Sequence, residues 1–124
     1  MIAVDTSTWI AYLSGDLGKD TDVLDQALAD SLVAMPPVVL SELLSDSKLP
    51  KTVTRLLISI PALAVTNGYW QRSGILRSKL LAKRNKAKLA DTLIAQTCID
   101  HNVRLITRDS DFKNFKNFGL KTLP

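Results

Sequence analysis

Apolar residues along the chain follow two kinds of spacing, which predict short buried strands and amphipathic helices. Short, mainly apolar runs predict strands at residues 2–4, 32–35, 63–65, 103–107 and near 120–123. Apolar residues three and four positions apart predict helices at about residues 9–13, 23–28, 37–44, 53–60, 69–80, 90–101 and 111–115. Strands that alternate with helices, without hairpin turn signals, indicate an α/β fold in which a parallel sheet carries helices on both faces.

The composition is that of one folded domain spanning residues 1–124, with 46% hydrophobic and 23% charged residues. A chain of this length buries roughly two-thirds of its unfolded surface on folding. The single cysteine, Cys98, can form no internal disulfide, which is typical of a reducing compartment. No run reaches the roughly 18 apolar residues of a membrane helix, and Asp5 interrupts any signal peptide. We therefore expect a soluble, cytoplasmic protein without membrane attachment.

The charges are unevenly distributed along the chain, although the net charge is only +4. Residues 1–46 carry eight acids and one base, whereas residues 47–90 carry ten bases and no acid. A basic segment attracts phosphate backbones, but it can equally be a solvated helix face. The cations of this segment that we consider candidate RNA contacts are Arg77, Lys83, Arg84, Lys86 and Lys88.

Two acids directly follow predicted strands, where the active sites of open parallel sheets collect. Asp5 comes after the first strand, and Asp109 comes shortly after the strand at residues 103–107. Each has a second interpretation, because Asp5 and Asp109 could also cap the helices that follow them.

Asp91 and Glu42 lie within predicted helices. Asp91 shares a helical face with the apolar residues Ile94, Ala95 and Cys98, where a carboxylate is costly unless it meets a cation or strong donors. A helix cap is the alternative for Asp91. Glu42, the only glutamate of the chain, lies off the apolar stripe of its helix, so periodicity alone predicts a surface residue.

Four segments in order resemble the PIN-domain nucleases, and specifically the small VapC-type toxins of bacterial and archaeal toxin–antitoxin pairs. They are IAVDTSTWI at residues 2–10, SEL at 41–43, LADTLIA at 89–95 and LITRDSDF at 105–112. The resemblance extends over essentially the whole chain. It implies a PIN-like three-layer fold, with a central parallel sheet of about five strands and helices on both faces.

The resemblance also implies which residues form the site. The implied acidic quartet is Asp5, Glu42, Asp91 and Asp109, with Asp111 as an ambiguous further member. The hydroxyl groups that would support a metal ion or its waters are those of Thr6, Ser7 and Thr107.

A divalent cation is the expected cofactor, because several carboxylates brought together repel one another without one. Mg²⁺ prefers oxygen ligands, and we expect Mn²⁺ to substitute for it. One cysteine and one histidine cannot build a soft-metal site. Asp5 and Asp91 are the expected direct ligands, Asp109 would hold a metal water or a second ion, and Glu42 would orient water or complete the shell.

The expected function is therefore that of a metal-dependent endoribonuclease, the toxin of a toxin–antitoxin pair. The resemblance implies a homodimer and a cognate antitoxin. A PIN-like module that binds RNA or protein without cutting remains the alternative. A receiver domain and a haloacid-dehalogenase-type phosphatase fit less well, because Thr6 rather than an acid follows Asp5, and Ser7 stands where the phosphatase would need a second aspartate.

Overall fold

The computed structural model describes residues 1–123, and its elements follow the order expected from the sequence. They are β1 (Ile2–Val4), α1 (Thr6–Leu13), α2 (Lys19–Ala29), β2 (Val33–Ala34), α3 (Pro37–Leu44), α4 (Lys51–Ser59), α5 (Tyr69–Ala82), α6 (Leu89–His101), β3 (Arg104–Ile106) and the 3-10 helix η1 (Ser110–Phe118). No helix in this part of the chain has both the length and the apolar character needed to cross a bilayer.

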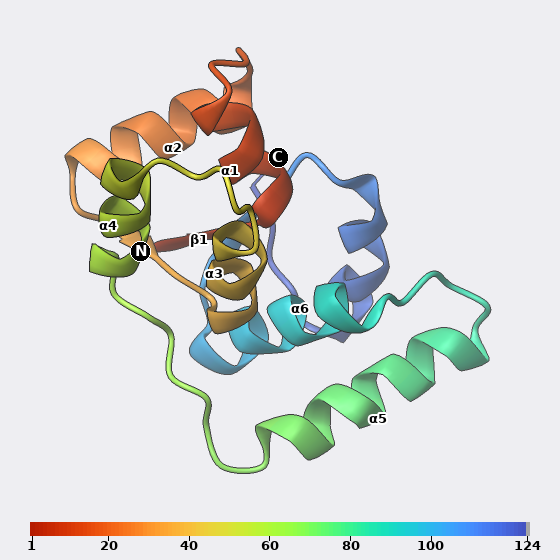
Figure 1. The fold of residues 1–124 in the computed structure, drawn as a ribbon. Helices are drawn as coiled ribbons and strands as arrows, with labels where there is room; N and C mark the ends of the chain where they lie inside the picture. Colours follow the sequence, from red (N-terminus) through yellow and green to blue (C-terminus); the bar gives the residue numbers. More distant parts are fainter. Residues whose placement is uncertain (124) are drawn as a thin grey trace.

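A parallel sheet in the order β2–β1–β3 forms the centre of the molecule. The middle strand, β1, pairs with both neighbours, so that Ile2 lies opposite Val33 on one side and Arg104 on the other. Because the strands are parallel, their carboxyl ends meet at one edge of the sheet, where Asp5 follows β1 and Thr107 follows β3. The predicted α/β fold, a parallel sheet with flanking helices, is confirmed (Figure 1).

The sheet has three strands among residues 1–123 rather than the expected five, because the outer two are reduced to single bridges. Ala62 bridges to Met35 beside β2, and Thr122 bridges to Leu105 beside β3. Pro61 accepts a hydrogen bond from Met35 N at 2.8 Å but has no N–H of its own, which limits pairing on that side. Residues 63–65, expected as a strand, form none.

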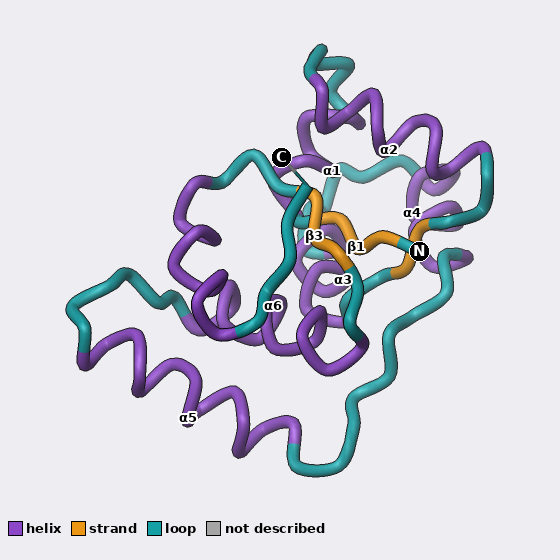
Figure 2. Tube along the Cα trace, turned by 180° about the vertical axis from the view of Figure 1, so that it is seen from behind, coloured by secondary structure: helices purple, strands orange, loops and turns teal. Residues whose placement is uncertain are grey.

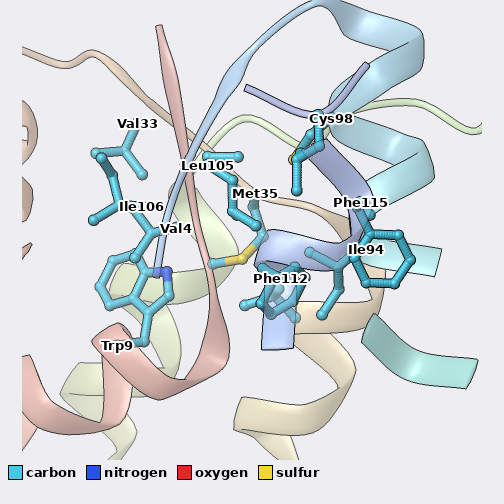
Figure 3. Close-up of a cluster of buried hydrophobic side chains, with 14 of the residues drawn as sticks. Val4, Trp9, Val33, Met35, Ile94, Cys98, Leu105, Ile106, Phe112 and Phe115 are labelled. Carbon is cyan, nitrogen blue, oxygen red and sulfur yellow. The ribbon is translucent and has the colours of Figure 1, made fainter. Parts of the chain in front are cut away.

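The helices cover both faces of the sheet. Figures 1 and 2 show α1 and α2 on one side of the strands and α3 and α6 on the other, with α5 outside α6. The side chains of Val4 and Ile106 meet Trp9 of α1 on the first face, and Leu105 lies with Cys98 on the second (Figure 3). All five side chains are buried, so each face of the sheet contributes to the hydrophobic core.

An ion pair fastens α5 to α6. Arg72 Nη2 lies 2.7 Å from Asp100 Oδ2, and the same guanidinium donates to the backbone oxygen of Asn67 at 2.7 Å. Gln96 also donates to Asp100, at 2.9 Å. Arg72 therefore holds the helix pair together and is already satisfied by these partners.

Two glycines allow a matched test of backbone strain. Gly119 follows η1 with a φ of 106°, a conformation that an L-residue rarely adopts, whereas Gly74 lies within α5 with nothing within 4 Å of an added Cβ. We expect Gly119→Ala to lower the free energy of unfolding by about 1–2 kcal/mol and Gly74→Ala to raise it by up to about 1 kcal/mol. Urea unfolding measures both. Equal or greater stability of Gly119→Ala would contradict the strained turn.

Candidate active site

Asp5 is the one acid among the buried residues of the described chain, with 4% of its surface exposed. Its Oδ2 accepts hydrogen bonds from Ser7 Oγ at 2.8 Å and from Thr107 Oγ1 at 2.9 Å. Burial raises the pKa of Asp5 above its ordinary value, and the two hydroxyl groups partly oppose that rise. Asp5 occupies the cap position of α1, as the cap interpretation predicts, but its side chain makes no capping hydrogen bond.

Asp109 belongs to a tight turn that follows β3. Its backbone N–H donates to Thr107 Oγ1 at 3.0 Å, and its Oδ1 accepts from Asp111 N at 2.9 Å. The cap interpretation is thus confirmed for Asp109, which caps η1. One carboxylate oxygen is used in this way, while Oδ2 accepts no hydrogen bond within residues 1–123. Asp111 is half-buried and contributes to the turn through its backbone.

An ion pair that sequence analysis missed holds the turn in place. Arg108 donates to Asp20 twice, from Nε and from Nη2, at 2.8 Å each. The buried Thr8 adds a third hydrogen bond, from Oγ1 to Asp20 Oδ2 at 2.9 Å. Arg108 lowers the pKa of Asp20 to about 2. The turn that carries Thr107 and Asp109 is therefore tied to the start of α2.

Glu42 is exposed on α3, as its position off the apolar stripe predicts. Its Oε1 nevertheless accepts a hydrogen bond from Thr6 Oγ1 at 2.7 Å, and Thr6 is the residue after Asp5. The contact fastens the glutamate to the first turn of α1. The prediction that Glu42 lies at the surface is therefore correct, but the helical pattern gave no reason to expect its hydrogen bond with Thr6.

Asp91 lies in the first turn of α6, whose cap position is Lys88, so it is not the cap residue. It is half-buried above Ile94, Ala95 and Cys98, which are fully buried as the sequence pattern predicts. Burial is the largest of the causes that raise the pKa of Asp91 to about 6.

The other causes of the raised pKa of Asp91 are charges of its neighbours. Repulsion from Asp5, Asp109 and Glu42 adds to the effect of burial, and Lys88 partly opposes it. Asp5, Asp109 and Glu42, the other three acids predicted from the sequence, therefore lie within electrostatic reach of Asp91.

The candidate RNA contacts differ in their exposure and in the contacts that their side chains already make. Arg77 is half-buried and donates from Nε to the backbone oxygen of Ala87 at 2.7 Å, so it supports the loop between α5 and α6. Lys83 lies 5.2 Å from the centre of the Phe118 ring. The exposed members of the predicted set are Lys83, Arg84, Lys86 and Lys88.

The side chains around Asp91 suit a hard cation. The donors are carboxylate and hydroxyl oxygens, which Mg²⁺ prefers. Burial raises the pKa of the Cys98 thiol to about 12, and His101 Nε2 lies 2.7 Å from the backbone oxygen of Ala64, so neither is a metal ligand here. Residues 1–123 contain no group of three acidic, histidine or cysteine side chains already gathered around one point. Mg²⁺ needs only one or two carboxylates, together with waters and substrate phosphate.

The chain belongs to the PIN domain family, because the family model for the PIN domain matches residues 2–117. The family predicted from the four sequence segments is therefore confirmed. Among curated proteins, Ribonuclease VapC11 of Mycobacterium tuberculosis is 29% identical over 119 residues, which cover 90% of this chain and 89% of that protein. VapC ribonuclease Mb1587 of Mycobacterium bovis matches with the same identity and coverage.

Solved structures agree on the fold. VapBC2 from Rickettsia felis, solved with a DNA fragment from its promoter, has a chain that superposes with a TM-score of 0.73 at 23% identity, covering 100% of both chains. FitAcB from Neisseria gonorrhoeae gives a TM-score of 0.72 at 18% identity, over 100% of this chain and 97% of that one. VapBC-5 from Mycobacterium tuberculosis gives 0.66 at 20% identity, over 98% and 96%.

The crowding of carboxylates predicts how stability depends on pH in the metal-free protein. The pKa of Asp91 is about 6 in the folded state and about 3.9 in an unfolded chain. The stability associated with its protonated form is fully present below about pH 4 and is lost as the pH rises to about 6. We expect Asp91→Asn in EDTA to exceed the wild type at pH 7.5 by roughly 1–3 kcal/mol and to match it near pH 4.

Urea unfolding of both proteins between pH 4 and pH 8 measures this difference. Asp22→Asn is the matched control. Asp22 is an exposed acid in the first turn of α2, and its carboxylate makes no hydrogen bond or ion pair within residues 1–123. If the difference in free energy of unfolding between the wild type and Asp91→Asn stayed constant across this range, the pKa of Asp91 would not be raised in the folded state, which would contradict the prediction.

Proposed function

We propose that this PIN domain is a metal-dependent endoribonuclease that acts as the toxin of a toxin–antitoxin pair. The observation that supports the proposal is the state of Asp91, whose pKa is raised to about 6 by burial and by repulsion from Asp5, Asp109 and Glu42. Such a cluster is unfavourable without a cation, and functional sites often contain locally unfavourable choices of this kind. The VapC ribonucleases similar to this chain support RNA as the substrate.

In the proposed site, Asp5 and Asp91 would be the direct ligands of Mg²⁺ or Mn²⁺, and Asp109 would hold a metal water or a second ion. When bound, the cation supplies Lewis-acid stabilisation of the negative charge that develops on the phosphate oxygens. Ser7 and Thr107 fix the rotamer of Asp5 through hydrogen bonds to its Oδ2. Asp111 is a possible further ligand through its carboxylate.

The reaction is hydrolysis of an RNA phosphodiester bond. Water attacks phosphorus, the bond from phosphorus to the leaving ribose oxygen breaks, and that oxygen takes up a proton. Glu42, held by Thr6, orients the attacking water or accepts its proton. Lys83, Arg84, Lys86 and Lys88 attract the phosphate backbone, and Lys88 is close enough to Asp91 to lower its pKa.

The partners of the toxin are a second copy of the chain and an antitoxin. The antitoxin is supported by the similarity of this fold to chains of VapBC complexes. It is also supported by a groove of about 340 Å³ beside Glu42, lined by Ile10, Leu13, Leu43 and Val53 among others. Ile10 is 55% exposed there, which suits burial under an apolar segment of a partner.

Metal dependence is tested with purified protein and RNA. We expect cleavage of RNA in Mg²⁺ or Mn²⁺, and loss of that cleavage when EDTA is added, because the carboxylates then repel both one another and the phosphate. The products are followed by gel electrophoresis. Cleavage that persists in chelator would contradict the metal-dependent mechanism. Tight RNA binding without cleavage in either metal would favour the non-cutting alternative.

Thr107 tests the support of Asp5. Thr107→Val keeps the shape but removes the hydroxyl group that donates to Asp5 Oδ2 and accepts from Asp109 N. We expect the kcat of RNA cleavage to fall by about tenfold or more, in line with about 1.4 kcal/mol for each factor of ten. Thr107→Ser retains the hydroxyl group and should keep most of the activity. Equal activity of Thr107→Val and Thr107→Ser would show that the hydroxyl group does not matter.

A further inference from the structure

A second pocket, of about 400 Å³, lies beside the candidate active site. Thr107 and Asp109 line it, and both also belong to the hydrogen-bonded turn described above. The opposite wall comes from η1 and from residues 122–123, next to the bridge between Leu105 and Thr122. The pocket therefore opens beyond the carboxyl end of β3, where parallel sheets bind their ligands.

Two lysines of η1 line the pocket without an acidic partner. Lys113 and Lys116 are exposed and lie three residues apart, a spacing that places them on the same side of a 3-10 helix. The two ion pairs found within residues 1–123 involve neither of them. Arg108 also lines the pocket, but its charge is satisfied by Asp20. Lys113 and Lys116 are thus the unpaired cations of the pocket.

Neutral groups complete the pocket. The hydroxyl groups of Ser110 and Thr122 line it and make no hydrogen bond with the rest of the described chain. Phe112 packs into the core with Phe115, which fixes η1 and hence the two lysines against the sheet. A volume of about 400 Å³ lies in the range of small-molecule sites. The lining thus offers two unpaired cations and two free hydroxyl groups beside the carboxylate of Asp109, and the cations make the space suited to an anion with polar substituents.

The helix η1, which forms part of the pocket, also contacts the basic loop between α5 and α6. Asn114 of η1 donates to the backbone oxygen of Lys86 at 3.4 Å, and Lys83 lies over the ring of Phe118. Cations therefore flank the acids on two sides, with Lys88 beside Asp91 and the lysines of η1 beside Asp109. A polyanion that crosses the acids needs such compensation, because the carboxylates repel it.

We propose that this pocket binds the phosphate and ribose of the nucleotide next to the bond that is cut. The inference rests on the proposed function, because it places a second part of the same RNA strand. Lys113 and Lys116 hold the phosphate, and the hydroxyl groups of Ser110 and Thr122 hydrogen-bond to it or to the ribose. The pocket contributes to binding of the strand, whereas the carboxylates act on the neighbouring phosphate.

The test compares the wild type with the double variant Lys113→Gln/Lys116→Gln on a fluorescein-labelled single-stranded oligoribonucleotide. Binding is measured by fluorescence anisotropy in EDTA, where the strand stays intact, and cleavage is measured in Mg²⁺. We expect the KM and the Kd to rise about five- to twentyfold, with kcat changed less than twofold. The slope of log K against log salt should become shallower by about 0.7 for each lysine removed.

Two further variants separate a specific pocket from a general effect of charge. Lys48→Gln/Lys51→Gln removes the same charge from exposed positions that line none of the pockets beside the acids, and it should change KM less than twofold. Lys113→Arg/Lys116→Arg keeps the cations and should restore binding. Thermal melts of all variants establish that the fold is retained.

The outcomes distinguish this inference from the proposed function. If the wild type neither binds nor cuts RNA, the proposed function itself fails. If the wild type cuts RNA and the η1 double variant keeps its KM, or loses no more than the Lys48/Lys51 control, the pocket inference is wrong. It is equally wrong if the η1 variant keeps its RNA affinity but no longer binds a protein partner, since the pocket would then be a protein-docking site.

Discussion

The rest of the structure depends on one electrostatic constraint, the mutual repulsion between Asp91 and the acids near it at the carboxyl end of a small parallel sheet. Burial and repulsion from Asp5, Asp109 and Glu42 raise the pKa of Asp91 to about 6. Asp5 itself is buried and accepts hydrogen bonds from the hydroxyl groups of Ser7 and Thr107. An isolated protein gains nothing from this arrangement, because each additional charge makes the others harder to ionise. The arrangement becomes favourable when a divalent cation and a phosphate share it, as we propose.

The surrounding contacts keep the carboxylates from moving apart. Asp5 is joined to β3 by its backbone, since its N–H donates to Ile106 O at 2.8 Å. The turn that carries Asp109 is fixed by the ion pair between Arg108 and Asp20. These restraints come from β1, β3 and α2, and the hydrogen bond from Thr6 adds Glu42 of α3. The acids are therefore positioned by parts of the chain that are far apart in sequence.

Part of this could be predicted from the sequence and part could not. The apolar surroundings of Asp91 could be predicted, because helical spacing alone places Asp91 on the same face as Ile94 and Cys98. Glu42 was identified only through the family resemblance, since its helix position indicates an ordinary surface residue. The pair of Arg108 and Asp20 joins positions 88 residues apart, and no local pattern records such a contact.

Two predictions from the sequence differ from the structure: the strand at residues 63–65 and the position of the lysines beside Asp109. The run at residues 63–65 has the composition of a strand, yet pairing is limited to a bridge at Ala62 after Pro61. The dense basic segment indicated RNA contacts within residues 77–88, whereas the pocket beside Asp109 is lined by Lys113 and Lys116, which lie outside that segment. These lysines lie beside Asp109 because they belong to η1, the helix that Asp109 caps.

The central claim is most directly tested by the titration of the Asp91 carboxyl group itself. Carbon-13 NMR of the side-chain carboxyl carbons, assigned with Asp91→Asn, follows each midpoint in EDTA and again in Mg²⁺. The account predicts a midpoint near 6 for Asp91 in EDTA, and a shift to lower pH when Mg²⁺ is added. A midpoint near the ordinary aspartate value of about 3.9, unchanged by Mg²⁺, would contradict it.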